Sequence, residues 1–289
     1  MPNPRLMIDA ALSANAVLEL DEAQARHIGT VLRLDEGDAL RVFNAADGEW
    51  GARVSEKKKR SMHVRVEEFL RAPRVTPDLD LLFAPVKRHA TDLIVEKATE
   101  LGVRRIRPVI TQRTIAETVR VDRLQSIARE AAEQTERFDA PEIFEPQKLE
   151  RALDGWDARQ LIYADESGDE AGEDWGGEKG RAAPVAQALR AFSLAEKVAS
   201  EREPDAGRRQ AHGDGGAAER PSPPTLSPQG RGGLALLIGP EGGFTPEERR
   251  MLRALPFVTP VSLGPRILRA ETAVIAGLSV IQSAWGDWR

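Results

Sequence analysis

The stretch Leu236-Leu-Ile-Gly-Pro-Glu-Gly-Gly-Phe-Thr-Pro-Glu-Glu248 combines a short apolar run, three glycines and the start of a helix. The glycines permit backbone conformations that are closed to other residues, and they let a ligand approach the main chain. Thr245 is a good N-cap, Pro246 suits the first helical position, and Glu248 completes a capping box. The stretch therefore predicts a strand, a loop with room for a ligand, and a helix in succession.

Acidic residues at the start of this helix restrict the kind of ligand. Glu247 and Glu248 stand in the first turn, where they complement the helix dipole but repel the phosphate that a helix N-terminus otherwise attracts. The Gly-Lys-Ser/Thr ending of a nucleotide-binding P-loop is missing as well. The residues favour a neutral or cationic ligand, although a loop of this kind is, taken alone, more often a purely structural turn.

A second stretch of the same kind is Val261-Ser-Leu-Gly-Pro-Arg-Ile-Leu-Arg-Ala-Glu-Thr-Ala273. An apolar strand expected at 257–263 leads into Gly-Pro and then into a long helix that carries small residues. Two parallel strands that each lead into a Gly-Pro loop bring both loops to the carboxyl end of one sheet, where α/β proteins bind ligands. Arg269, by itself an ordinary surface or ion-paired residue, becomes a candidate catalytic cation beside such a site.

Composition narrows the class of protein. The chain has 289 residues, 41% of them apolar, enough for one large or two smaller domains with a sizeable core. It has no cysteine, its four histidines are far apart, and it has no uninterrupted apolar run of membrane-spanning length. The first residues lack the apolar stretch of a secretion signal. We therefore expect a soluble, cytoplasmic protein without a metal and without a membrane partner.

The net charge of −5 leaves a nucleic-acid partner open. Residues 165–233 contain 13 acidic and 9 basic residues, a charge of −4, so the other 220 residues carry only −1. Electrostatic binding depends on where the basic side chains gather, and a nearly neutral body can carry a basic face.

The pattern of apolar residues divides the chain in two. Residues 1–74 alternate with period two and predict a small β-barrel. From residue 75 onward, strands alternate with helices and predict a mostly parallel sheet; the strands are expected at 79–84, 107–110, 160–164 and 234–238, and the helices at 90–101 and 121–138. Residues 204–232 are polar and rich in Gly and Pro, and a disordered insertion is predicted at about 191–232.

At this point the two loops resemble a known family. Ile238-Gly-Pro-Glu-Gly-Gly-Phe-Thr245 together with Leu263-Gly-Pro-Arg-Ile-Leu-Arg-Ala-Glu-Thr-Ala273 is similar to the RsmE family, the bacterial 16S ribosomal-RNA uridine-N3 methyltransferases of the SPOUT class. Shorter matches extend the resemblance over nearly the whole length; they lie at 27–33, 96–103, 130–134 and 140–143.

The resemblance implies a fold, a reaction and partners. Residues 1–74 would form a PUA-like RNA-binding β-barrel, and residues 75–289 a trefoil-knotted parallel sheet with helices on both faces. The enzyme would methylate N3 of a specific uridine in 16S ribosomal RNA, uridine 1498 in the family. S-adenosyl-L-methionine would be the methyl donor, the substrate would be 16S rRNA or the assembled small subunit, and the chain would form a homodimer.

Carried over by position, the two loops would wrap the donor, whose sulfonium and lack of phosphate agree with an acidic helix start. The donor-binding residues implied are Ile238, Gly239, Pro240, Glu241, Gly242, Gly243, Leu263, Gly264, Ile267, Leu268 and Ala273. Tyr163 and the three residues after it would form a third wall.

Methylation of N3 requires a nitrogen that has lost its proton, and the negative charge then spreads onto two carbonyl oxygens. A guanidinium would stabilise this charge, with Arg269 the first choice and Arg137, at a basic position of the family, the second. Glu271 or Glu241 would accept the proton, although roles in orienting Arg269 or anchoring the helix explain these acids as well. Phe138 departs from the polar residue expected next to Arg137.

Basic residues outside the two loops are candidates for contacts with RNA phosphates, although each is equally well an ordinary surface residue. The candidates are Arg5, Arg26, Arg33, Lys57, Lys58 and Lys59. Two other classes of protein remain open. An RNA-binding adaptor without catalysis is opposed by the intact glycines and by Arg269. A nucleotide-hydrolysing enzyme is opposed by the missing lysine and the acidic first turn.

Overall fold

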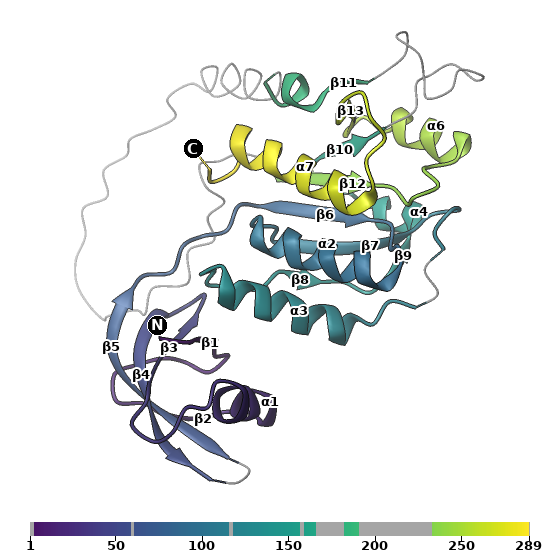
Figure 1. Ribbon diagram of the computed structural model, residues 1–289. Helices are drawn as coiled ribbons and strands as arrows, with labels where there is room; N and C mark the ends of the chain where they lie inside the picture. The colour runs from purple at the N-terminus through teal and green to yellow at the C-terminus, as the bar shows by residue number, and fades with distance from the viewer. Residues whose placement is uncertain are drawn as a thin grey trace, which may run out of the picture. The chain divides into compact units, whose positions relative to one another are not determined.

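The computed structural model describes residues 3–58, 61–115, 118–156, 159–165, 182–190 and 233–288, which form two compact units (Figure 1). The first unit comprises Met1–Thr76 and Asp122–Pro141, and the second comprises Pro77–Val121 and Glu142–Arg289. The segment 122–141, expected in the C-terminal domain, therefore packs with the N-terminal residues. The expected insertion at 191–232 lies outside the described residues.

The first unit contains a five-stranded sheet in the order β1-β3-β4-β5-β2. Only β1 and β3 pair in parallel; the other neighbours are antiparallel. Alternate residues of the long strands are buried, as the period-two pattern predicts, and Val42, Val54 and Val64 lie in one apolar cluster. The strands are β1 Arg5–Met7, β2 Val17–Glu19, β3 Ala39–Asn44, β4 Gly48–Lys57 and β5 Met62–Arg71.

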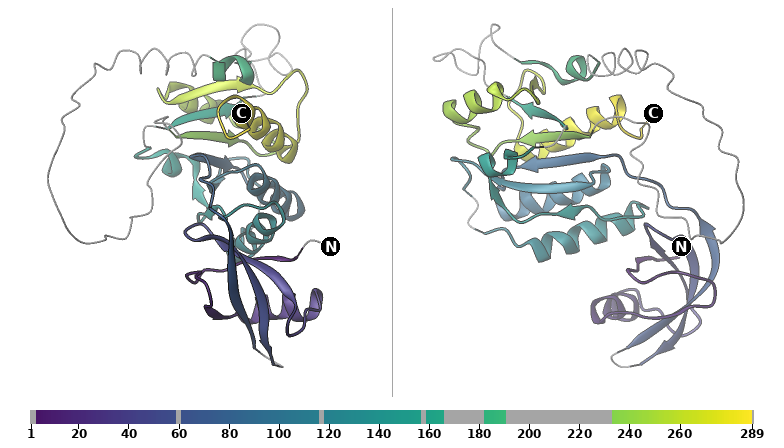
Figure 2. Two further views of the ribbon diagram at one scale, coloured as in Figure 1. Left: turned by 90° about the vertical axis from the view of Figure 1, so that its left-hand side faces the viewer. Right: turned by 180° about the vertical axis from the view of Figure 1, so that it is seen from behind.

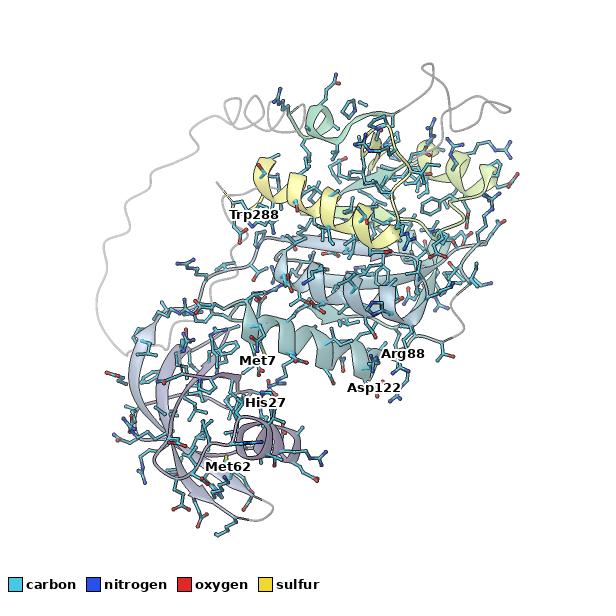
Figure 3. All side chains as sticks on the ribbon, viewed as in Figure 1. Met7, His27, Met62, Arg88, Asp122 and Trp288 are labelled. Carbon is cyan, nitrogen blue, oxygen red and sulfur yellow. The ribbon has the colours of Figure 1, made fainter. Side chains whose placement is uncertain are left out.

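A short helical segment, which the alternating pattern does not reveal, covers this sheet. Helix α1 (Glu22–Arg26) begins with a capping box at Asp21 and continues into the π-helical turn η1 (His27–Val31). Its buried face includes Ile28 but no residue of α1, so its apolar periodicity is too short to detect. Met62, labelled in Figure 3, belongs to the cluster beneath it.

Helix α3 (Val121–Gln134) docks on the first unit and ends four residues before the predicted end at 138. Glu136 has a φ of 61°, a left-handed conformation that stops the helix. Phe138 then turns inward and meets Phe43 edge-on at 6.3 Å between ring centroids. Phe138, at the position where the family pattern led us to expect a polar residue, is therefore a core residue.

The second unit contains an eight-stranded sheet in the order β11-β13-β10-β12-β6-β7-β8, with β9 beside β7. Every pairing in it is parallel, which confirms the predicted class of sheet. The strands are β6 Leu79–Phe83, β7 Arg105–Ile110, β8 Glu142–Ile143, β9 Gln147–Lys148, β10 Gln160–Ala164, β11 Ala183–Pro184, β12 Leu234–Ile238 and β13 Val258–Ser262.

Helices cover both faces of this sheet. Helices α2 (Arg88–Glu100) and α7 (Ala270–Ala284) pack against each other on one side (Figure 2). There α7 meets β12 closely: a Cβ on Gly277 would lie 2.8 Å from a methyl of Leu236. Leu237, the next residue along β12, points to the opposite face, where α4 (Leu149–Leu153) and α6 (Pro246–Ala254) contribute to a second apolar cluster. Within the described ranges, no helix is long and apolar enough to cross a membrane.

Candidate functional site

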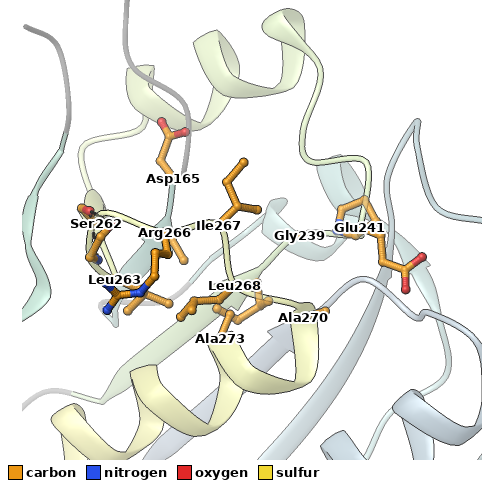
Figure 4. Close-up of a pocket in the computed structure, with 14 residues that line it drawn as sticks. Asp165, Gly239, Glu241, Ser262, Leu263, Arg266, Ile267, Leu268, Ala270 and Ala273 are labelled. Atoms are coloured by element: carbon orange, nitrogen blue, oxygen red, sulfur yellow. Dashed lines mark hydrogen bonds between the residues drawn. The ribbon is translucent and has the colours of Figure 1, made fainter. Parts of the chain in front are cut away.

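A pocket lies at the carboxyl ends of β10, β12 and β13 (Figure 4). Because β10 pairs in parallel with both β12 and β13, the loops that follow these strands converge at one edge of the sheet. The hollow, counted out to its open mouth and including open solvent, measures about 740 Å³.

The pocket is lined by nine of the residues predicted to bind the donor, namely Ile238, Gly239, Pro240, Glu241, Leu263, Gly264, Ile267, Leu268 and Ala273. Gly242 and Gly243, the other two predicted residues, are not among its lining residues. Ala164, Asp165, Ser262, Arg266 and Ala270 line it in addition. The structure thus brings the two Gly-Pro loops together, while binding of a donor by them stays a prediction.

The first loop is held rigidly from inside the unit. A Cβ on Gly239 would lie 2.5 Å from the ring of Phe244, so only glycine fits there without displacing that ring. Phe244 is buried and meets the ring of Tyr163 edge-on at 5.1 Å. Gly243 has a φ of 66°, which closes the turn before α6 and favours glycine.

A segment after β7 holds the outer side of the same loop, and no sequence signal indicated it. The guanidinium of Arg113 donates to the carbonyl of Gly242 at 2.8 Å, and the backbone N–H of Gln112 donates to Glu248 Oε1 at 2.8 Å. The other oxygen of Glu248 accepts from the N–H of Thr245 at 2.9 Å. The predicted capping box is confirmed. The carboxylate of Glu248 is also buried, and its hydrogen bond with Gln112 links α6 to the residues after β7.

The second loop passes from β13 to α7. Gly264 has a φ of 116°, a backbone conformation that residues other than glycine rarely adopt. Its N–H donates a hydrogen bond to Ser262 Oγ at 3.2 Å. Arg266 and Ile267 follow as exposed residues, yet both line the pocket. This loop therefore places a basic residue in the pocket wall directly after Gly264-Pro265.

The predicted catalytic residues of this loop lie just outside the pocket lining. Arg269 is the exposed N-cap residue of α7, and its side chain makes no capping hydrogen bond. Glu271 is half-buried in the first turn of the same helix. The residues on either side of Arg269, Leu268 and Ala270, do line the pocket, so Arg269 lies at its rim.

Asp165 forms the third wall, at the end of β10. Its carboxylate is buried and accepts from Arg249 Nε at 3.1 Å and from Arg253 Nη2 at 2.6 Å, both on α6. Burial alone would lower the pKa of Arg249, but hydrogen bonding and charge from Asp165, with Tyr163, raise this pKa above its ordinary value. Two arginines neutralise Asp165, so its charge serves to attach α6 to β10.

The second-choice catalytic residue lies in the other unit. Arg137 follows α3, and its guanidinium pairs with Asp139 at 3.0 Å, with little of the side chain exposed. Its backbone carbonyl accepts from Arg5. A catalytic role for Arg137 stays a prediction.

The predicted RNA-contacting residues differ in their surroundings. Arg5 is buried and donates to Glu49 and to the carbonyls of Ala132 and Arg137, so this side chain stabilises the first unit and leaves no face for a phosphate. By contrast, Arg26, Lys57 and Lys58 line an open hollow between α1–η1 and the hairpin of β4 and β5. Arg33 is exposed with a φ of 59°. Lys59 lies outside the described residues.

Comparison with known proteins gives the class of this chain. Residues 74–189 and 208–282 match the RNA methyltransferase domain, and residues 20–67 match the RNA methyltransferase PUA domain. The chain therefore belongs to the RNA methyltransferase family that these domains define.

The particular relatives agree with the resemblance to the RsmE family and confirm it. Ribosomal RNA small subunit methyltransferase E of Rickettsia conorii is 29% identical over 279 residues, which cover 96% of this chain and 94% of that protein. The protein of the same name from Synechocystis sp. is 26% identical over 287 residues, covering 96% of this chain and 77% of that protein.

Solved structures show the same fold. The methyltransferase Lpg2936 from Legionella pneumophila, in complex with bound SAM, has a TM-score of 0.72 at 28% identity, and the match covers 99% of this chain and 100% of that one. Ribosomal RNA small subunit methyltransferase E from Neisseria gonorrhoeae, bound to S-adenosyl methionine, has a TM-score of 0.71 at 23% identity with the same coverage.

Proposed function

We propose that this protein is an S-adenosyl-L-methionine-dependent methyltransferase that modifies N3 of a uridine in 16S ribosomal RNA of the small subunit, at the position numbered 1498 in the family. The observation that carries the proposal is the pocket between the Gly-Pro-Glu loop and the Gly-Pro-Arg loop, which are the two motifs that resemble the family. Small-subunit methyltransferases E are similar over nearly the whole chain, and two solved relatives hold this donor.

The residues of the pocket suit this donor. Its walls combine the main chain of two glycine loops with apolar side chains such as Ile238 and Leu268, which suits an adenosine. Among the described residues, Arg266 is the one basic residue in the lining, and this part of the pocket offers no cluster of cations for a triphosphate. Glu241 supplies a negative charge that a sulfonium or ammonium group tolerates. When bound, the donor supplies a methyl group on a positively charged sulfur.

The protein's own residues would prepare the uracil. Attack from N3 requires loss of its proton, and Arg269 at the rim of the pocket would stabilise the negative charge on the flanking carbonyl oxygens. Arg137 is the second candidate for this role. Glu271, in the first turn of α7, or Glu241, in the pocket wall, would accept the proton. Asp165 is not assigned this task because Arg249 and Arg253 already bind both of its oxygens.

Calorimetry with S-adenosylmethionine and with ATP tests the proposal. We expect one donor molecule to bind per chain and no heat from ATP. Binding of ATP alone would overturn the proposal, whereas an RNA-binding adaptor without catalysis would bind neither. Mapping methyl groups in small-subunit RNA from a strain that lacks the gene would identify the nucleotide, because the modification should disappear at one uridine.

The hollow lined by Arg26, Lys57 and Lys58 is the proposed phosphate-binding surface of the first unit. Replacing Lys57, Lys58 and Lys59 by Ala is expected to flatten the slope of log K against log salt by up to about 0.7–0.9 for each phosphate contact that is lost, because each contact releases a counterion. RNA binding measured at several salt concentrations gives the slope. Arg5 is not replaced in this variant, because its buried side chain stabilises the first unit. An unchanged slope would show that these lysines do not touch RNA.

Five further properties belong to the same proposal. In the second unit β10 lies between β12 and β13 although it precedes both in sequence, and this crossover is compatible with the trefoil knot that the family implies. We further propose that the sheet of the first unit closes into a PUA-like barrel, that residues 1–74 and 75–289 act as the RNA-binding and catalytic domains, and that the protein is a cytoplasmic homodimer.

A further inference from the structure

The pocket has a simple distribution of charge. In the described part of the chain, three ionisable residues line it, namely Asp165, Glu241 and Arg266. Asp165 is buried and is neutralised by Arg249 and Arg253. Glu241 and Arg266 are exposed, and neither forms an ion pair with another residue in the described part of the chain. Among the described residues, Arg266 and Glu241 are therefore the two lining side chains whose charge no ion pair within the protein offsets.

These two charges lie at opposite ends of the pocket (Figure 4). Arg266 lies beside Ser262 and Leu263, on the loop that leaves β13, whereas Glu241 lies across the pocket on the loop that leaves β12. The turn at Gly264 and its contact with Ser262 Oγ set the direction of the chain just before Arg266. The pocket is polarised along its length, and a ligand with separated charges would bind in one orientation.

We propose that Arg266 binds the carboxylate at the amino-acid end of the donor, and that it selects for donors in which this carboxylate is intact. The inference rests on the proposed function. S-adenosylmethionine has one anionic group, its carboxylate, and two cationic ones, the ammonium and the sulfonium. A guanidinium repels both cations and forms charge-assisted, fork-like hydrogen bonds with a carboxylate. Glu241, on the loop that leaves β12, favours a positively charged group of the ligand.

The position of Arg266 separates its role from that of Arg269. Arg266 is one of the residues that line the pocket, whereas Arg269 lies at the rim outside the lining. The first would act on the donor and the second on the uracil. Arg266 is thus a specificity-determining residue for the donor rather than the group that stabilises the uracil anion.

Two ligands that differ only in the carboxylate measure its contribution to binding. S-adenosylhomocysteine and its decarboxylated analogue both lack the sulfonium, and they differ only in the carboxylate. By calorimetry we expect the wild-type protein to bind S-adenosylhomocysteine about tenfold more tightly than the analogue. Arg266→Ala should abolish this preference by weakening S-adenosylhomocysteine alone, and Arg266→Lys should restore part of it. Arg250→Ala is the matched control, since Arg250 is exposed, pairs with Glu247 and lies outside the pocket lining.

The outcomes distinguish the inference from the proposed function. If Arg266→Ala keeps the wild-type preference, or weakens both ligands by the same factor, the carboxylate role is overturned while the methyltransferase proposal stands. If the wild-type protein binds neither ligand and no S-adenosylmethionine, both are overturned. Loss of the preference in Arg266→Ala together with its retention in Arg250→Ala establishes the role.

Discussion

Arg269→Ala is expected to lower kcat by about 10²–10³-fold while donor binding is largely kept. The reason is position: Arg269 follows Leu268 and precedes Ala270, both of which line the pocket, yet it is itself an exposed residue at the rim. A cation there contributes little to holding a donor in the pocket. It can meet the negative charge that develops on the uracil only in the transition state, so its loss should appear in kcat.

The measurement is single-turnover methylation of small-subunit RNA, with calorimetry of S-adenosylhomocysteine in parallel. Folding should not change, because the side chain of Arg269 makes no capping hydrogen bond at the start of α7. Arg269→Lys, which keeps the charge but loses the planar fork, should recover part of the rate. Turnover at the wild-type rate in Arg269→Ala would exclude the role, and an equally large loss of donor affinity would move Arg269 to the donor site.

Glu49→Ala should lower the free energy of unfolding of the first unit by about 3–5 kcal/mol, the cost of leaving buried charges without their partner. The Glu49 carboxylate is fully buried and pairs with Arg5 at 2.9 Å, with Arg41 at 3.1 Å and with Arg71. Arg5 is itself buried and attaches the end of α3 to the sheet through the carbonyls of Ala132 and Arg137. Removing the acid leaves Arg5 charged in the core.

Urea unfolding of the full chain checks this prediction, with Glu67→Ala as the control. Glu67 is an exposed strand residue that pairs with Arg53 on the neighbouring strand, and its loss should change the free energy by no more than about 1 kcal/mol. The unfolding midpoint of Glu49→Ala should therefore fall far below that of Glu67→Ala. Equal midpoints would show that the three arginines find other partners or solvent when Glu49 is absent.

The longer strands of the second unit and the start of α6 were predictable because their signals are local. β6, β10 and β12 are short apolar runs between turn residues, and the Thr245–Glu248 capping box uses neighbours in sequence. Helix α1 was missed because it buries none of its own residues. Helix α3 was predicted as a helix, but its docking on the first unit depends on Met7, Phe43 and Phe138, which lie far apart in the chain.

For the site too, local sequence signals predicted one part, and contacts between distant residues decided the other. The two glycine motifs located the pocket, since a Gly-Pro turn after a parallel strand has a definite place in an α/β sheet. The sequence could not distinguish the arginines. Arg5, a candidate for RNA contact, is buried on Glu49, and Arg266, not singled out among the site residues, lies in the pocket wall. Nor could it reveal that Arg113 and Gln112 hold the glycine loop from outside.

The sequence by itself determined most of the longer elements, the parallel class of the sheet and the two loops, because backbone conformation and apolar periodicity depend on residues a few positions apart. Only the tertiary structure decided which charged side chains are buried with partners and which face the pocket. Ion pairs such as Asp165 with Arg249 join residues 84 positions apart, and no local pattern specifies them. Burial and charge pairing arise when distant segments pack, and they assign each arginine its role.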